Sequence, residues 1–293
     1  MPQDFLYRGL FTQSNIRFSY ALTSELANTA ILQHQTDPVA SHILCRGLTA
    51  AALTSPQLTE EEKFSFQWDY TGPLSRITIE AAADAKVRGY TNQKNLIGLA
   101  ETEEELYGEK GTLSVIKSTS KRVLNSGTAE ATLFDIVDDL SYYFSVSNQN
   151  ETDVVTKLHF RPNPESPVEI SQGVLLQAMP DCDYEVLEKM RANMRSVKFQ
   201  ELLASQPETD NYFELLIREM TDGLDEQAYE IYACNKPQFY CSCDKNKTLN
   251  VIRTLDNTEI QEIIDKGETV KVNCDFCSTT YDFDSNDLKI LLD

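Results

Sequence analysis

Apolar side chains recur every three or four positions in several stretches of the chain, and this period predicts amphipathic helices. The helices predicted in this way are 19–35, 38–55, 132–147, 183–205 and 211–223. Other stretches alternate between apolar and polar residues or form short apolar runs, which predicts strands. The strands predicted are two around a Gly72-Pro73 turn within 63–83, and one each at 111–118, 153–162 and 173–180. Because helical and strand runs occur separately, the sequence indicates an α+β fold.

The pattern changes character twice, which predicts three regions. Residues 1–180 mix helices and strands and form a core domain. Residues 181–234 form a helical linker with thirteen acidic and five basic residues. The apolar stripes of the linker helices either pack permanently on the core or are uncovered at times, and periodicity does not separate these two interpretations. Residues 235–293 form a small C-terminal domain, in which Asp256, Glu259 and Gly267 predict the start and end of one more helix.

Composition and charge limit the partners that we expect. The chain has 293 residues, 41% of them hydrophobic, and a formal net charge of −20. Such a charge repels phosphate backbones, so we expect no nucleic-acid partner. No run approaches the about 20 apolar residues of a membrane span, and the N-terminus lacks the apolar run of a signal peptide. We therefore expect a cytoplasmic protein without a membrane partner, whose cysteines lie in a reducing environment.

Four of the seven cysteines form two tight pairs near the C-terminus. Cys241 and Cys243 form a C-x-C motif, and Cys274 and Cys277 form a C-x-x-C motif. Four thiolates in two pairs match the ligand set of a structural zinc site, so we expect one Zn²⁺ per chain. The sequence contains no recognisable nucleophile–base group or phosphate-binding loop, so we do not expect an enzyme. The histidines, which are scattered and form no H-E-x-x-H motif, are His34, His42 and His159.

Zinc is expected to decide whether the C-terminal domain folds, because a region of this size buries little apolar surface. Structural zinc contributes on the order of 10–16 kcal/mol of apparent binding free energy. Sulfurs bound to a tetrahedral zinc lie about 4 Å apart, whereas those of a disulfide lie ~2.05 Å apart, so one pair cannot do both. The four thiols are therefore either a permanent structural site or a site that oxidation empties through two local disulfides. Cys45, Cys182 and Cys234 have no partner spacing, and we expect incidental thiols there, although Cys234 is near enough in sequence to compete in disulfide exchange.

The cysteine pattern, together with several core segments, resembles the heat-shock protein 33 family of 33 kDa chaperonins. The segments that carry this resemblance, in the order in which the family has them, are GPL at 72–74, VRGY at 87–90, DLSYYFSVSNQ at 139–149, GVLLQAMP at 173–180, and the aromatic residues Tyr281 and Phe283. The similarity covers nearly the whole chain. It departs at Ser278, Ala85 and Gln172, where the family commonly has glycine, which leaves the local backbone there in question.

The resemblance implies an ATP-independent holdase chaperone that binds unfolding client proteins under oxidative stress. It implies a reduced, zinc-bound inactive form and an oxidised active form that dimerises. Cys241, Cys243, Cys274 and Cys277 would be both the zinc ligands and the redox-switch disulfides. The linker 181–234 would unfold with the zinc domain and uncover the client-binding surface. The alternative from another class is a constitutive zinc-ribbon module that binds a protein or nucleic acid, and the excess of acidic residues in 235–293 argues against nucleic acid.

Overall fold

A computed structural model describes residues 3–147, 149–207 and 211–292, without the side chains of 233 and 234. The chain divides into two compact units, Met1–Phe239 and Tyr240–Asp293, and each is described by itself. Mixed helix and sheet content confirms the predicted α+β class. No helix in the described ranges is long and apolar enough to cross a membrane.

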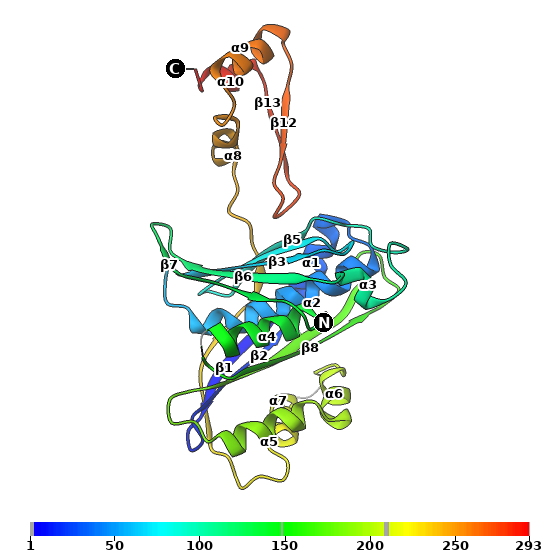
Figure 1. Ribbon diagram of the computed structural model, residues 1–293, viewed down its shortest axis with the longest axis vertical. Helices are drawn as coiled ribbons and strands as arrows, with labels where there is room; N and C mark the ends of the chain where they lie inside the picture. The colour runs from blue at the N-terminus through cyan, green and yellow to red at the C-terminus, as the bar shows by residue number, and fades with distance from the viewer. Residues whose placement is uncertain (1–2, 148, 208–210, 293) are drawn as a thin grey trace. The chain divides into compact units, whose positions relative to one another are not determined.

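The larger unit contains two sheets with three helices between them (Figure 1). The five-stranded sheet, in the order β10-β1-β2-β9-β8, consists of β10(Tyr229–Asn235), β1(Phe5–Phe11), β2(Ile16–Leu22), β9(Val168–Ala178) and β8(Thr152–Phe160). The six-stranded sheet, in the order β11-β5-β4-β3-β6-β7, consists of β11(Gln238–Phe239), β5(Lys86–Thr91), β4(Arg76–Ala82), β3(Lys63–Tyr70), β6(Gly111–Ser118) and β7(Val123–Glu130). All neighbouring strands are antiparallel except β11 and β5.

The helices between the sheets form the main hydrophobic core. These helices are α1(Ser24–His34), α2(Pro38–Thr54) and α4(Ile136–Ser147), and the shorter elements of this unit are the 3-10 helix η1(Ser55–Gln57) and α3(Glu103–Tyr107). Helix α2 contacts strands of both sheets, which explains why it is apolar around most of its circumference. The side chains of Leu48, Phe66 and Trp68 are fully buried in this core.

Helix α1 begins at a buried carboxylate that comes from the start of the chain. The side chain of Asp4 accepts hydrogen bonds from the backbone N–H groups of Glu25 and Leu26, at 2.9 and 2.8 Å. Burial raises the pKa of Asp4 to about 7, although the two backbone hydrogen bonds act in the opposite direction. The N-terminal segment is thereby fastened to the core by a group whose charge is costly to bury.

Three further helices cover the outer face of the five-stranded sheet: α5(Tyr184–Met194), α6(Val197–Leu203) and α7(Tyr212–Met220). Their apolar stripes are buried against strand residues such as Phe18, Tyr20 and Leu176, and form a second hydrophobic core. Gln172 of β9 also joins this layer, since its side-chain amide donates hydrogen bonds to the carbonyl oxygens of Leu203 and Ser205 and accepts one from the Tyr20 hydroxyl.

The structure corrects the sequence prediction in three places. Residues 19–22 belong to strand β2 rather than to a helix, because their apolar side chains lie on both faces of a sheet that is covered on both sides. The helix predicted at 183–205 is two helices, α5 and α6. Ser196 separates them, because it is the N-cap residue of α6 and its side chain accepts a hydrogen bond from the Phe199 N–H. The 181–234 segment ends in strand β10 and is therefore not helical throughout. Asn148 and residues 208–210 lie outside the described residues.

The smaller unit consists of α8(Lys245–Ile252), α9(Asn257–Lys266), β12(Val270–Asn273), β13(Thr280–Phe283) and α10(Ser285–Lys289). The predicted helix is confirmed as α9, with a capping box between Asp256 and Glu259 and with Gly267 in the left-handed conformation at its end. Its buried hydrophobic core has four members, Ile252, Ile260, Phe283 and Leu288. This is a small core for a unit of three helices and a two-stranded sheet, and it makes the cysteine cluster important to stability.

Candidate metal centre

The four paired cysteines come from two separate segments of the smaller unit. Cys241 and Cys243 lie in an extended stretch that leads to α8, whose N-terminus is capped by Asp244 through a 2.8 Å hydrogen bond from the Lys247 N–H. Cys274 and Cys277 lie in the turn between β12 and β13. The cap and the hairpin fix the two segments locally, so each presents its pair of sulfurs from a defined backbone.

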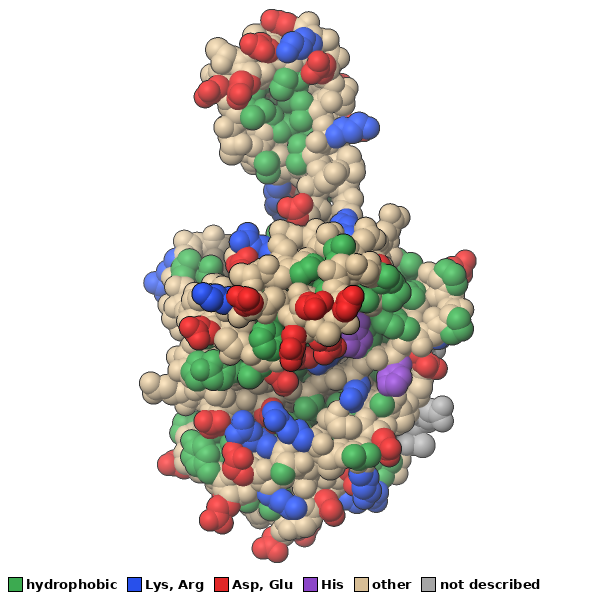
Figure 2. Space-filling model, turned by 45° about the vertical axis from the view of Figure 1, so that its right-hand side comes forward, with side chains coloured by type: hydrophobic (Ala, Val, Ile, Leu, Met, Phe, Trp, Pro, Cys, Tyr) green, Lys and Arg blue, Asp and Glu red, His purple; other side chains and the backbone are tan. Residues whose placement is uncertain are grey.

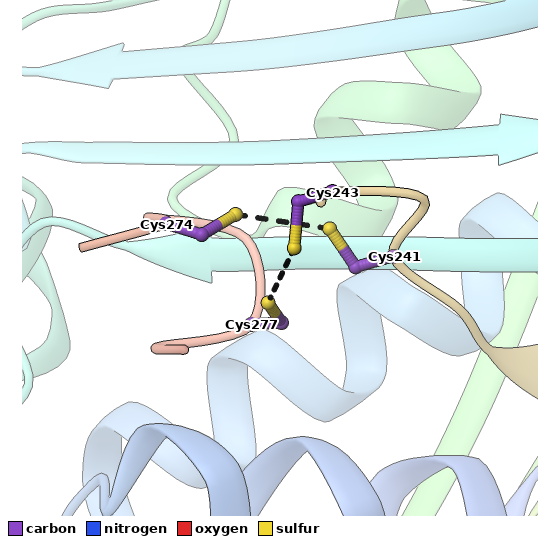
Figure 3. Close-up of side chains that lie close together, drawn as sticks. All are labelled: Cys241, Cys243, Cys274 and Cys277. Carbon is purple, nitrogen blue, oxygen red and sulfur yellow. Dashed lines mark hydrogen bonds between the residues drawn. The ribbon is translucent and has the colours of Figure 1, made fainter. Parts of the chain in front are cut away.

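The structure brings all four sulfurs together (Figure 3). Their Sγ atoms lie within 4.8 Å of one another. Two contacts join the motifs, with 3.7 Å between the sulfurs of Cys241 and Cys274 and 3.3 Å between those of Cys243 and Cys277. Four thiols at these separations fit the roughly 4 Å spacing of sulfurs around a tetrahedral ion. Four cysteines in this arrangement can therefore hold a metal ion.

The turn that carries Cys274 and Cys277 is a tight knuckle held by backbone hydrogen bonds. The carbonyl oxygen of Cys274 accepts from the N–H groups of Cys277 and Ser278, at 3.3 and 2.7 Å. Ser278 has a φ of 56°, which is the left-handed conformation that glycine adopts most easily. Ala85 also has a positive φ, of 60°, whereas Gln172 does not. The backbone at Ser278 and Ala85 therefore keeps a glycine-like conformation, and the side chains carry the strain.

Hydroxyl groups around the cluster act on the thiols. The Tyr281 hydroxyl lies 3.2 Å from the Cys243 sulfur, and the Thr279 hydroxyl lies 3.2 Å from the Cys277 sulfur. Burial alone would raise the pKa of Cys277, but hydrogen bonds with Thr279 and with neighbouring thiols lower it to about 7. Burial raises the pKa of Cys274 to about 12, together with hydrogen bonds to Cys277 and Cys241. The thiol of Cys277 is thus prepared to ionise, whereas a nearby cation would be needed to ionise that of Cys274 at neutral pH.

Sequence reasoning missed the role of these two hydroxyl groups. Tyr281 was identified only as an aromatic position, although its place on β13, paired with Val272 of β12, sets it beside the knuckle. Successive side chains of a strand point to opposite faces, and this alternation in the strand after the C-x-x-C turn is the signal that could have placed Tyr281 beside the thiols.

The other cysteines and the histidines lie in the larger unit. Cys45 is fully buried, and burial raises its pKa. Cys182 is half-buried, and its pKa is raised for the same reason. Neither thiol has the lowered pKa that reactive cysteines show. The side chain of Cys234 lies outside the described residues. We searched the described residues for His, Cys, Asp and Glu side chains that lie close enough together to share a metal ion, and the four paired cysteines form such a group.

Comparison with known proteins agrees with this arrangement. The family model described as Hsp33 protein matches residues 4–284. The 33 kDa chaperonin of Staphylococcus carnosus is 28% identical over 298 residues, which cover 100% of this chain and 99% of that protein. The 33 kDa chaperonin of Lachnoclostridium phytofermentans is 28% identical over 295 residues, with 99% and 98% covered.

A solved structure has the same fold. The crystal structure of the 33 kDa chaperonin from Thermotoga maritima, a heat shock protein 33 homologue, has a TM-score of 0.82 and 24% identity, and the match covers 99% of this chain and 98% of that one. The matched sequences are those of chaperones of the Hsp33 family, and the matched structure has their fold. The chain belongs to the Hsp33 family, since the family model spans nearly all of it.

Proposed function

We propose that this protein is a redox-regulated holdase, which binds unfolding client proteins without ATP when it is oxidised and is inactive when it is reduced and holds zinc. The observation that carries this proposal is the convergence of four thiols in a unit whose buried core has four members. A unit of this kind folds or unfolds according to whether the thiols hold a metal ion.

Zinc is the ion that we assign to the cluster, with Cys241, Cys243, Cys274 and Cys277 as its ligands. Four sulfur ligands with no open position favour a structural rather than a catalytic ion. Zinc would supply no reaction here, and its part is to stabilise the smaller unit. The Tyr281 hydroxyl, at 3.2 Å from the Cys243 sulfur, would orient one ligand through a hydrogen bond.

Oxidation would empty the site. Each disulfide forms from two thiols, which give two electrons and two protons to an oxidant of the peroxide or hypochlorite class, and the ion leaves because disulfide sulfurs no longer coordinate it. In the folded unit, close sulfur contacts join different motifs, at 3.7 and 3.3 Å. We nevertheless propose that Cys241 pairs with Cys243 and Cys274 with Cys277. Once the unit loses its ion and unfolds, closing a long loop between motifs costs more entropy than closing a short loop within one.

The linker helices α5, α6 and α7 would cover the client-binding surface in the reduced protein and uncover it on oxidation. The apolar stripes of α5, α6 and α7 are buried against the outer face of the five-stranded sheet. These helices have seven to eleven residues, too few to be stable alone in water, so they melt when their packing is lost. Melting would expose Phe18, Tyr20 and Leu176 of the sheet together with the helices' own apolar residues. Such a surface can hold exposed apolar segments of a client, and it also favours a homodimer of the active form.

The test compares the reduced, zinc-bound protein with the oxidised protein. Light scattering of a thermally unfolding client without ATP should be suppressed by the oxidised form only. Zinc content and free thiols are measured on the same samples, and peptide mapping identifies the disulfides. A Cys182→Ala variant, which leaves the cluster intact, should behave as the unmodified protein. If the oxidised protein does not protect the client, the chain is better explained as a constitutive zinc-ribbon module.

A further inference from the structure

Two arginines of the five-stranded sheet lie near each other without an acidic partner. Arg17 of β2 is paired with Leu10 of β1, and Arg8 is two residues from Leu10, so both side chains leave the same face of the sheet. Both are half-buried, and neither forms an ion pair with a described carboxylate. Burial and the nearby charge of Arg8 lower the pKa of Arg17. Two like charges are therefore held close together in a partly desolvated place.

Two neighbouring cavities lie at these arginines, at the margin of the layer between the two sheets. They have volumes of about 310 and 220 Å³, and Arg17 and Met179 line both. The first is also lined by Gln57 and Lys117, and the second by Arg8. None of the described residues that line either cavity is Asp or Glu. The chain has 46 acidic residues, and their side chains are spread over the face seen in Figure 2, so the lining of these cavities differs in charge from that surface.

Buried hydrogen-bond donors near the arginines also lack partners. Arg8 Nε, Ser19 Oγ, Ser55 Oγ and Gln57 Nε2 are buried without a hydrogen bond. Ser19 is fully buried and is the strand partner of Arg8, and Ser55 is fully buried beside Pro56, which lines the second cavity. Unpaired buried donors are uncommon in folded proteins, because their desolvation is not offset. Unsatisfied donors on Arg8, its strand partner Ser19 and the cavity-lining Gln57, beside two cations without a carboxylate partner, point to an acceptor-rich anion.

Other groups nearby account for only part of this arrangement. Lys117 is neutralised by Glu62, at 2.8 Å. Glu230 of the edge strand interacts with the Tyr232 hydroxyl rather than with an arginine. The C-terminus of α2 directly precedes η1, and its dipole favours nearby cations. Arg17 donates one hydrogen bond, of 3.2 Å, to the Gln177 side chain. In the described part of the chain, no carboxylate forms an ion pair with either guanidinium group.

We propose that these two cavities, the Arg8–Arg17 site, bind a compact phosphate-type anion, either inorganic or the phosphoryl group of a small phosphorylated molecule. Two guanidinium groups match the charge of a phosphate dianion, and its several oxygens accept from the arginine and glutamine N–H groups. The site lies in the larger unit and uses no cysteine, so the inference does not rest on the proposed redox function.

Isothermal titration calorimetry of the reduced full-length protein tests this site. Inorganic phosphate, pyrophosphate and glycerol 3-phosphate are titrated separately in a chloride buffer of low ionic strength. We expect one site per chain, and Arg8→Gln and Arg17→Gln should each weaken binding about tenfold or more. Arg122→Gln is the matched control, because it removes the same charge from an exposed position of the same unit and should leave binding unchanged. Tighter binding of glycerol 3-phosphate than of phosphate would identify a phosphorylated small molecule as the ligand, and the reverse order would identify an inorganic anion.

Arginine modification provides a second measurement that needs no variant. Phenylglyoxal reacts with accessible arginines, and mass spectrometry locates the products. Phosphate should slow modification of Arg8 and Arg17 and leave that of Arg122 unchanged. The proposal is overturned if none of the three anions binds, if Arg122→Gln weakens binding as much as the other variants, or if phosphate protects all three arginines alike. The first outcome would indicate that the helix dipole alone accommodates the two cations, and either of the other two would indicate that any binding is an adventitious ion only.

Discussion

The two units of the chain reach stability by different means. The larger unit buries aromatic and aliphatic side chains in two extensive cores, one on each side of the five-stranded sheet. The smaller unit buries four apolar residues in its core and places four thiols where a metal ion can join its two segments. Apolar burial responds little to redox conditions, whereas thiolate ligation is lost at once on oxidation. A chain that combines both can therefore unfold one part chemically while the other part remains folded.

Removal of the metal should separate the two units most clearly. We expect a strong chelator to abolish amide protection in residues 240–292 under reducing conditions, because zinc contributes on the order of 10–16 kcal/mol to such units. Hydrogen exchange measured by mass spectrometry reports on this change. Trp68, the only tryptophan, is fully buried in the core between the sheets, so its fluorescence should stay constant. Protection that survives the chelator would mean that the four-residue core suffices.

Phe283→Ala and Phe144→Ala form a matched pair across the two units. Both side chains are fully buried, and each substitution should cost about 3–5 kcal/mol. In the smaller unit, folding and metal binding are one equilibrium, so Phe283→Ala should weaken zinc affinity by about a hundredfold or more. Phe144→Ala should lower the stability of the larger unit and leave zinc affinity unchanged. Competition with a chromophoric chelator measures the affinity, and equal values for the two variants would contradict the comparison.

The larger unit should respond to pH through Asp4. Its pKa is about 7 in the folded chain and 3.8 as the ordinary value, so the folded state keeps a proton that the unfolded state has lost. Stability should therefore fall as pH rises from about 4 to about 7, by up to about 4 kcal/mol, and change no further above that window. Asp4→Asn should reduce this dependence. Urea unfolding followed by Trp68 fluorescence measures it, and identical pH profiles for the two proteins would show that Asp4 is ionised throughout.

The Tyr281 hydroxyl group tests how far the thiols depend on their surroundings. Tyr281→Phe removes the hydrogen bond to the Cys243 sulfur and keeps the ring, and we expect zinc affinity to fall about tenfold. Tyr142→Phe, at an exposed position of α4, is the control and should have no effect. A loss of the same size in both variants would mean that the hydroxyl group does not act on the ligand.

Ser278→Gly should stabilise the smaller unit slightly. The serine has a φ of 56°, and glycine removes the cost of that conformation, for a gain of about 1 kcal/mol. Gly267→Ala is the opposite test, since a Cβ there meets no atom within 4 Å and only the φ of 68° opposes it. The midpoint of thermal unfolding of the zinc-bound unit should rise for the first variant and fall for the second. A fall for Ser278→Gly would indicate that the serine side chain is needed in the knuckle.

Sequence patterns predicted the helices and the convergence of the cysteines better than the sheets. The α9 boundaries follow from Asp256, Glu259 and Gly267, because capping depends on residues adjacent in sequence. Strand β1 is not predicted because its buried and exposed positions do not alternate regularly, and strand β7 is not predicted because most of its side chains are exposed. The strand at 19–22 was mistaken for a helix because a sheet covered on both faces has no alternation. The Arg8–Arg17 pair depends on register between two strands, which local patterns do not encode.

Strands β9 and β10 hold both ends of the segment that carries α5, α6 and α7. Strand β9 ends at Ala178 and β10 begins at Tyr229, and β1 and β2 lie between them in the sheet. The segment is thus a loop whose ends are anchored roughly 15 Å apart, at about 4.8 Å per strand. If its helices leave the sheet, they stay tethered beside it at an effective concentration in the millimolar range. Under the proposed function, a client protein would compete with this tethered segment for the same surface, and its apparent affinity would fall as the segment regains its fold. Client release would then require only the return of the protein's own chain.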